Sequence, residues 1–164
     1  MINAIVCVDK NWGIGKNNDL LFNLKEDMKF FREKTKEKIV VCGYNTLLSF
    51  PGSKPLKGRS TIVLCPKEIE RDDCYCIHDF DEMVRLVKEL SKTQEVFIIG
   101  GAMLYKSMLS YYDRVYVTHV DAADPEATAF FPNLVEAGFV VKSETSILEE
   151  GNYKFKMVTY ERGV

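Results

Sequence analysis

Two short apolar runs that stop at glycine limit most strongly how this chain can fold. Residues 38–42 end at Gly43, residues 95–99 run into Gly100 and Gly101, and a helical pattern follows each run. After the charged first residues Lys38 and Glu95, both runs are continuously apolar, which is typical of strands buried on both faces, as in parallel sheets covered by helices. The sequence therefore predicts an α/β fold in which helices connect the strands.

The rest of the chain continues this alternation and then ends in strands. Further strands are predicted over residues 2–8, 61–64, 72–77, 114–120, 139–145 and 153–162, and helices over residues 24–34, 44–50, 80–90 and 102–109. A turn at Gly151 and Asn152 predicts a C-terminal antiparallel hairpin. We expect one domain over residues 1–164, with a mixed, mostly parallel eight-stranded sheet and about four flanking helices.

The segment between the first strand and the first helix is predicted to be a mobile loop over residues 9–22. It contains Gly13, Gly15 and two adjacent asparagines, which permit unusual backbone angles. Trp12 and Ile14 are expected to anchor it. A loop of this kind can act as a lid over a ligand.

Two helix starts carry the spacing of a capping box, in which a short polar residue precedes Glu by three positions. Asn23 and Glu26 have this spacing before the first helix, and Asp79 and Glu82 have it before the helix over 80–90. We therefore expect Asn23 and Asp79 to cap these two helices.

Asp27 is predicted to lie on the apolar face of the first helix. Leu24, Met28 and Phe31 have the spacing that places side chains on one side of a helix, and Asp27 falls on the same side. One interpretation is that Asp27 stays solvated at the edge of this face and interacts with the positive end of the helix. The other is that it holds, orients or helps to protonate a nitrogen-rich ligand in an apolar site.

The strand–glycine–helix junctions at Gly43 and Gly100–Gly101 are candidate phosphate sites. Backbone N–H groups at a helix start attract anions, and glycine permits close approach. Alone, each junction is equally compatible with a tight turn. As a pair they predict a ligand with two phosphates, a dinucleotide, although no G-x-G-x-x-G pattern is present.

Composition narrows the function classes. The 164 residues are 46% hydrophobic and 28% charged, with a net charge of −2, so no basic surplus favours nucleic acid. No apolar run approaches the roughly 20 residues of a membrane helix, and the N-terminus does not resemble a signal peptide. We expect a cytoplasmic protein with no membrane partner.

The cysteine and histidine content gives no sign of a metal site. Five cysteines include no C-x-x-C pair, so neither a disulfide framework nor a zinc site is predicted, and most are expected to be small core residues. His119 is expected to be a strand residue with a satisfied hydrogen bond rather than a catalyst.

The motifs resemble those of dihydrofolate reductases over nearly the whole length of the chain. The matching segments, in the order and at the spacing of that family, are AIVCVDKNWGIG, NLKEDMKFFR, VVCGYNT, PLKGR, VFIIGGAMLY, VYVTHVD and FFP. The resemblance implies NADPH-dependent reduction of 7,8-dihydrofolate to tetrahydrofolate. It also implies that dihydrofolate and antifolate-type small molecules bind, and that the protein is a monomer.

The resemblance also implies roles for individual residues. Asp27 matches the acid that grips the pterin and assists protonation at N5, Thr118 matches the threonine behind it, and Arg59 matches the arginine that pairs with the folate tail. The implied catalytic set is completed by Leu20 and Phe22. The other implied substrate contacts are Ile5, Val6, Met28, Phe31, Phe50 and Ile99. The implied cofactor contacts are Val6, Cys7, Ile14, Gly15, Leu20, Gly43, Tyr44, Asn45, Thr46, Leu64, Cys65, Ile99, Gly100, Gly101, Ala102, Met103, Leu104 and Tyr105.

Several positions depart from the family pattern. Leu21-Phe22 replaces a Pro-Trp pair and loses the indole donor, while Thr128-Ala129 replaces Asp-Thr. Tyr44 stands in place of an arginine, and Cys65-Pro66 and Met103 replace serine or arginine near the 2′-phosphate of the cofactor. These changes remove donors from an anion site and predict a weakened preference for NADPH over NADH, unless Lys67 or another basic residue substitutes.

Two alternatives to a working dihydrofolate reductase remain. A pyrimidine reductase of riboflavin synthesis shares the fold but does not call for Asp27 in this helix or for Arg59. A non-catalytic nucleotide- or folate-binding protein is compatible with the changed residues Leu21-Phe22 and with the altered cofactor positions.

Overall fold

The computed structural model describes residues 1–16 and 19–163; Asn17 and Asn18, the adjacent asparagines of the predicted loop, lie outside this range. The strands of the main sheet are β1 (Ile2–Val8), β4 (Ile39–Gly43), β5 (Ser60–Leu64), β6 (Tyr75–Ile77), β7 (Val96–Ile98), β8 (Arg114–Val120), β10 (Phe139–Glu144), β11 (Leu148–Glu150) and β12 (Tyr153–Arg162). The remaining elements are strands β2 (Gly13–Lys16), β3 (Asp19–Leu20) and β9 (Ala129–Phe130), helices α1 (Lys25–Thr35), α2 (Tyr44–Ser49), α3 (Phe80–Leu90) and α4 (Ala102–Ser107), and 3-10 turns η1 (Pro51–Ser53) and η2 (Leu109–Tyr111).

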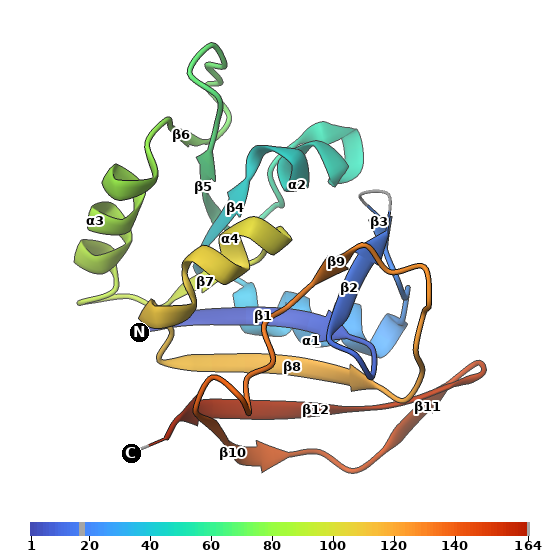
Figure 1. Cartoon of the computed structure of the whole chain (residues 1–164). Helices are drawn as coiled ribbons and strands as arrows, with labels where there is room; N and C mark the ends of the chain where they lie inside the picture. Colours follow the sequence, from blue (N-terminus) through green and yellow to red (C-terminus); the bar gives the residue numbers. More distant parts are fainter. Residues whose placement is uncertain (17–18, 164) are drawn as a thin grey trace.

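The main sheet has the predicted mixed, mostly parallel arrangement. Within the described residues its strand order is β10-β12-β8-β1-β7-β4-β5-β6, with β11 paired to β12 (Figure 1). The pairs from β8 through β1, β7, β4 and β5 to β6 are parallel, and the pairs of β12 with β8, β10 and β11 are antiparallel. The predicted fold class is confirmed, with β11 as an addition to the eight expected strands.

Helices cover both faces of this sheet. The buried side chains of α3 and α4 join one core with Ala4, Val6 and Val8 of β1, while α1 and α2 pack against a second core that contains Ile5. In Figure 1, α4 lies in front of the sheet and α1 behind it. Successive residues of β1 therefore face opposite cores, which explains why its sequence is apolar without alternation.

Two stretches of the predicted loop over residues 9–22 form strands, β2 and β3. Strand β2 pairs with both β3 and β9 in a small three-stranded sheet within the described residues. The buried carboxylate of Asp9 accepts hydrogen bonds from the backbone N–H groups of Asn11, Gly13 and Asp124 at 2.7–2.9 Å. The prediction of a loop was wrong for β2 and β3, because glycine-rich segments carry little strand propensity and β9, the second partner of β2, lies more than 100 residues away.

The two predicted capping boxes had different outcomes. The Asp79 carboxylate accepts a hydrogen bond from the Glu82 N–H at 3.0 Å, so the predicted cap of α3 is confirmed. The prediction for Asn23 was wrong: α1 begins at Lys25 after Leu24, and no side chain at the cap position accepts a hydrogen bond. Leu24 is buried in a further core cluster, with Phe22, Val120, Phe155 and Met157.

Candidate active site

The Asp27 side chain joins α1 to the centre of the main sheet. It is the third residue of α1, and its Oδ1 accepts a hydrogen bond of 2.7 Å from the Thr118 hydroxyl on β8. Cys7 on β1 pairs in register with Thr118, so the two central strands meet beneath the acid. The interpretation of Asp27 as a fully solvated residue at the helix edge does not fit this geometry.

The surroundings of Asp27 favour its neutral form. Burial raises the pKa of the Asp27 carboxyl, the hydrogen bond from Thr118 lowers it, and the negative charge of Glu150 raises it, with a net rise. The pKa values of the Cys7 thiol and the Tyr105 phenol are also raised by burial and by the charge of Asp27. Both groups are therefore neutral near pH 7, and Asp27 is the acid of this site that can change its protonation state under mild conditions.

Four of the apolar residues predicted for the substrate share one core cluster. Ile5 and Ile99 are buried in it, and Phe31 and Phe50 pack against it with part of their surface exposed. Met28, one helical turn before Arg32, is 46% exposed. These side chains lie on the α1 face of the sheet, the same face as Thr118, and offer partly exposed apolar surface near the acid.

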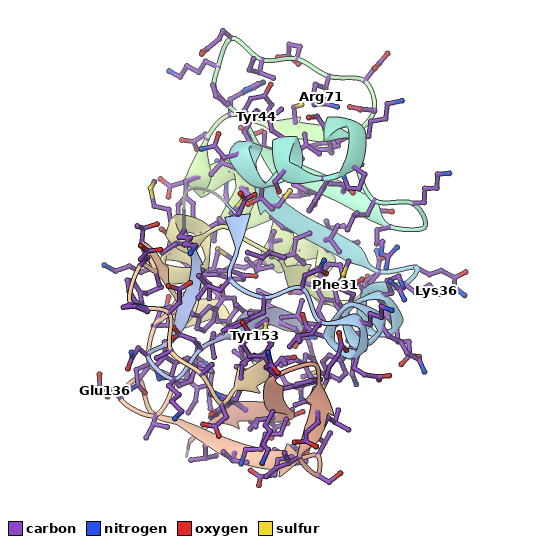
Figure 2. The ribbon with its side chains drawn as sticks, turned by 90° about the vertical axis from the view of Figure 1, so that its right-hand side faces the viewer. Phe31, Lys36, Tyr44, Arg71, Glu136 and Tyr153 are labelled. Atoms are coloured by element: carbon purple, nitrogen blue, oxygen red, sulfur yellow. The ribbon has the colours of Figure 1, made fainter. Side chains whose placement is uncertain are left out.

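Three predicted residues lie elsewhere. The Val6 side chain faces the opposite core, with α3 and α4, so only its backbone can serve a ligand on the α1 face. Leu20 is 75% exposed on β3. Phe22 is buried, with its ring 5.0 Å from that of Tyr153, and its side chain has no hydrogen-bond donor. Figure 2 labels Tyr153 below Phe31 in the turned view.

Arg59 is fixed beside the C-terminal half of α1. Its Nε donates to the Thr35 hydroxyl at 3.1 Å, Nη1 to the Lys57 carbonyl at 2.5 Å and Nη2 to the Arg32 carbonyl at 3.3 Å. Burial and the nearby positive charge of Arg32 lower the pKa of Arg59, although the guanidinium remains charged. Two cations at this position suit a ligand that ends in carboxylates.

The two strand–glycine–helix junctions are adjacent. The N–H of Gly43 donates to the Gly100 carbonyl at 2.9 Å, and β4 pairs with β7. A Cβ atom added at Gly101 would lie 3.3 Å from the Thr46 hydroxyl, so a side chain there would crowd it, while one at Gly43 would meet nothing within 4 Å. The helices that follow contain six residues each, so the fit to phosphate rests on glycine backbone and the Thr46 hydroxyl more than on helix dipoles. These residues fit the phosphates of a dinucleotide.

The other predicted cofactor residues divide by exposure. Exposed or partly exposed are Tyr44, Asn45, Leu64, Ala102 and Met103, and buried are Ile14, Gly15, Cys65, Leu104 and Tyr105. Leu104 lies within the core, and the Tyr105 hydroxyl donates to the Ile5 carbonyl at 2.8 Å. Burial raises the pKa of the Cys65 thiol to about 12, so it adds no charge to an anion site.

Arg71 is a cation near Tyr44 that the sequence analysis did not identify. Its guanidinium forms a bidentate pair with Asp73 at 2.6 and 2.9 Å and donates to the Ser53 carbonyl at 2.7 Å. The hydrogen bond with Asp73 is the largest cause that raises the pKa of Arg71, and Tyr44 adds to it. Figure 2 shows Tyr44 and Arg71 together at one end of the molecule. Residue spacing gave no signal for this contact.

Glu150 is a second residue that sequence reasoning missed. Its carboxylate accepts hydrogen bonds from the N–H groups of Lys25 at 2.8 Å and Glu26 at 3.3 Å. It is thus the group that caps α1. The partner lies 125 residues away, so a local pattern could not reveal it.

His119 behaves as predicted. Its Nε2 lies 2.8 Å from the Tyr160 hydroxyl, and its ring packs edge-on against Trp12. Burial lowers the pKa of His119 and the charge of Lys156 adds to this effect, so the ring is neutral near pH 7. Trp12 and Ile14 both pack against the core that contains α3 and α4, as expected for anchors of the segment over residues 9–22.

Two adjacent glycine junctions and a largely buried acid on the α1 face of the same sheet are typical of a nucleotide-dependent reductase of the α/β class. Comparison with known proteins narrows this class. The chain belongs to the dihydrofolate reductase family, which it matches over residues 1–162.

Individual relatives agree over their full lengths. The dihydrofolate reductase of Buchnera aphidicola is 32% identical over 163 residues, which cover 96% of this chain and 98% of that protein. The Bacillus subtilis enzyme is 31% identical over 165 residues, with 99% and 95% covered. A solved structure of the Enterococcus faecalis enzyme, complexed with NADP(H) and RAB-propyl, has a TM-score of 0.86 at 27% identity and covers 100% of this chain and 97% of that chain.

Two further findings concern the described part of the chain. Across residues 1–16 and 19–163, no helix is both long enough and apolar enough to cross a membrane. The same residues hold no group of three or more His, Cys, Asp or Glu side chains arranged for a metal ion.

Proposed function

We propose that this protein reduces 7,8-dihydrofolate to 5,6,7,8-tetrahydrofolate with NADPH, and that Asp27 binds the pterin and assists protonation at N5. The observation that carries this proposal is the hydrogen bond from Thr118 to Asp27 on the apolar α1 face. Membership of the dihydrofolate reductase family supports the substrate and the cofactor.

The chain contributes orientation and one titratable acid. NADPH supplies the hydride when bound. Thr118 holds one oxygen of the Asp27 carboxyl, which leaves the other oxygen to accept hydrogen bonds from a nitrogen-rich ring. Because the pKa of Asp27 is raised, a larger share of the protein carries the proton at neutral pH than an exposed aspartate would allow.

Other residues position the substrate. Ile5, Phe31, Phe50 and Ile99 supply apolar contacts, and Arg59 supplies a planar cation for a tail carboxylate. Phe22 has no donor, so we propose that it excludes water by its bulk and that protons reach the site without its help. Leu20, exposed on β3, is proposed to contribute only when β2 and β3 move toward the ligand.

The decisive experiment is an absorbance assay with purified protein, dihydrofolate and each nicotinamide cofactor. We expect loss of NADPH absorbance that requires dihydrofolate. Thermal stabilisation by the same ligands without turnover would instead indicate a binding protein. Turnover of a riboflavin-pathway pyrimidine, with none of dihydrofolate, would indicate the related reductase.

The cofactor preference is a separate prediction. Tyr44, Cys65 and Pro66 supply no positive charge for a 2′-phosphate, and the charge of Arg71 is shared with Asp73. We therefore expect a smaller ratio of kcat/KM for NADPH over NADH than in relatives that carry arginine at position 44. Arg71→Gln should lower the ratio further, about tenfold, if this guanidinium serves the phosphate. A large NADPH advantage that survives Arg71→Gln would contradict both statements.

The proposal includes a monomeric, single-domain protein that acts in the cytoplasm and also binds antifolate-type molecules. All five cysteines are free, which suits a reducing compartment. Analytical ultracentrifugation tests the oligomeric state, and displacement of dihydrofolate by a pteridine or diaminopyrimidine inhibitor tests the binding of antifolates.

A further inference from the structure

The turn of the β11–β12 hairpin lies at the start of α1. Glu150 is the last residue of β11, immediately before the turn at Gly151, and its two carboxylate oxygens accept from Lys25 N–H at 2.8 Å and Glu26 N–H at 3.3 Å. These are the first two residues of α1. A long-range contact therefore does what a cap residue ordinarily does within its own helix.

The capped turn is the one that carries Asp27. The N–H groups in the first turn of a helix give this end a partial positive charge, which favours a charged carboxylate nearby. A second carboxylate placed on those N–H groups opposes this effect. Glu150 thus fixes the backbone from which Asp27 projects and also reduces the tendency of that turn to ionise it.

The other groups around Asp27 do not duplicate this role. Thr118 on β8 donates a hydrogen bond that favours the charged carboxylate, and Cys7 on β1 and Tyr105 on α4 are neutral near pH 7. Glu150 on β11 supplies the formal charge whose field opposes ionisation of Asp27. On α1 itself, Lys25 and Glu26 carry opposite charges on consecutive exposed residues, so their effects offset each other.

We propose that Glu150 is a positioning residue for the reduction: it anchors the first turn of α1 to the β11–β12 hairpin, and its charge disfavours ionisation of the Asp27 carboxyl carried by that turn. The catalytic part of this statement rests on the proposed function, whereas the effect on Asp27 can be measured without it. The carboxylate acts in two separable ways, through hydrogen bonds and through charge.

Two substitutions separate these effects. Glu150→Gln keeps an acceptor oxygen but removes the charge, and Glu150→Ala removes both. The matched control is Glu149→Gln, which changes the net charge equally at the neighbouring exposed residue, whose nearest cation is Lys154 at 3.8 Å. The circular dichroism and thermal unfolding of each variant report whether the fold is retained.

The first measurement is the pH dependence of hydride transfer in single-turnover experiments. Loss of the Glu150 charge makes Asp27 ionise at lower pH, so the rate of Glu150→Gln should decline earlier as pH rises. We expect about threefold slower transfer at the alkaline end and little change at the acidic end, where Asp27 is protonated in both proteins. Glu149→Gln should follow the wild-type profile. A profile of Glu150→Gln that coincides with the wild type, or that falls equally at every pH, would overturn the proposal.

The second measurement does not require activity. The carboxyl carbon of Asp27, assigned by comparison with Asp27→Asn in ¹³C-aspartate-labelled protein, reports its titration by NMR. We expect its midpoint to move to lower pH in Glu150→Gln and not in Glu149→Gln. An unchanged midpoint overturns the inference even if the protein reduces dihydrofolate. A shifted midpoint in a protein that reduces no dihydrofolate would instead reject the proposed function and retain the effect of Glu150 on Asp27.

Discussion

The starts of α1 and α3 differ in where their capping group comes from. In α3 the cap is local, because Asp79 accepts from the Glu82 N–H three residues later. In α1 the cap is remote in sequence, because Glu150 on β11 accepts from the N–H groups of Lys25 and Glu26. The locally capped helix carries ordinary core packing, whereas the remotely capped helix carries the candidate catalytic acid. Because of this remote cap, the position of Asp27 depends on where the β11–β12 hairpin lies against α1.

The largest expected effect is on the rate of hydride transfer, and it tests whether Asp27 in the first turn of α1 takes part in the reaction. Asp27→Asn should lower the rate of hydride transfer at neutral pH by at least about 100-fold, because no other acid in the described site can replace it. NADPH affinity, measured by fluorescence titration, should change little. The matched control is Asp81→Asn in the first turn of α3, where Asp81 is exposed and should leave the rate unchanged. An unchanged rate in Asp27→Asn would remove Asp27 from the mechanism.

Thr118→Val tests the connection between that first turn and the sheet. The Thr118 hydroxyl lowers the pKa of Asp27 by donating to its carboxylate, so its loss should raise that pKa further. The pH–rate profile should therefore shift to higher pH, opposite to the shift expected for Glu150→Gln. The maximal rate should fall about tenfold, because the carboxyl is less well oriented. A shift toward lower pH would mean that Thr118 does not favour the charged form.

The stability of the two caps gives the most direct comparison. Asp79→Ala and Glu150→Ala should each reduce the free energy of unfolding by about 1 kcal/mol, since each removes the acceptor for first-turn N–H groups. Urea denaturation measures this loss. Activity per folded molecule should be retained in Asp79→Ala and reduced in Glu150→Ala. Equal activity in both variants would show that the remote cap is only a source of stability.

The smallest effect is expected where the sequence predicted a cap that the structure does not contain. Asn23 is exposed, and no side chain caps α1 at the residue before it begins. Asn23→Ala should therefore change the free energy of unfolding by less than about 0.5 kcal/mol. A loss comparable to that of Asp79→Ala would indicate that Asn23 does cap the helix in solution.

Much of the architecture was predictable because it depends on neighbours in the chain. The apolar runs of β1, β4 and β7 identify strands buried on both faces, and the apolar face of α3 identifies its packing side. The succession of parallel strands and helices along the chain follows from this alternation, whereas the strand order within the sheet does not. Strands β2 and β3 were missed because glycine-rich segments carry little strand propensity, and their pairing depends on β9.

The sequence predicted which residues form the candidate site, but not most of the contacts that hold them. The resemblance to dihydrofolate reductases indicated Asp27, Thr118 and Arg59, and the structure shows how these side chains are held. It also shows that Val6 faces the opposite core and that Leu20 lies exposed, which residue matching could not reveal.

The sequence alone determined the alternation of strands and helices, the local cap of α3 and the position of Asp27 on the apolar face of a helix. These features arise from residues within a few positions of one another, where backbone geometry sets the spacing. Tertiary structure decided the cap of α1 by Glu150, the hydrogen bond between Thr118 and Asp27 and the pairing of Arg71 with Ser53 and Asp73. Most of these contacts join residues far apart in sequence, so they form only when the assembled sheet brings those residues within hydrogen-bonding distance.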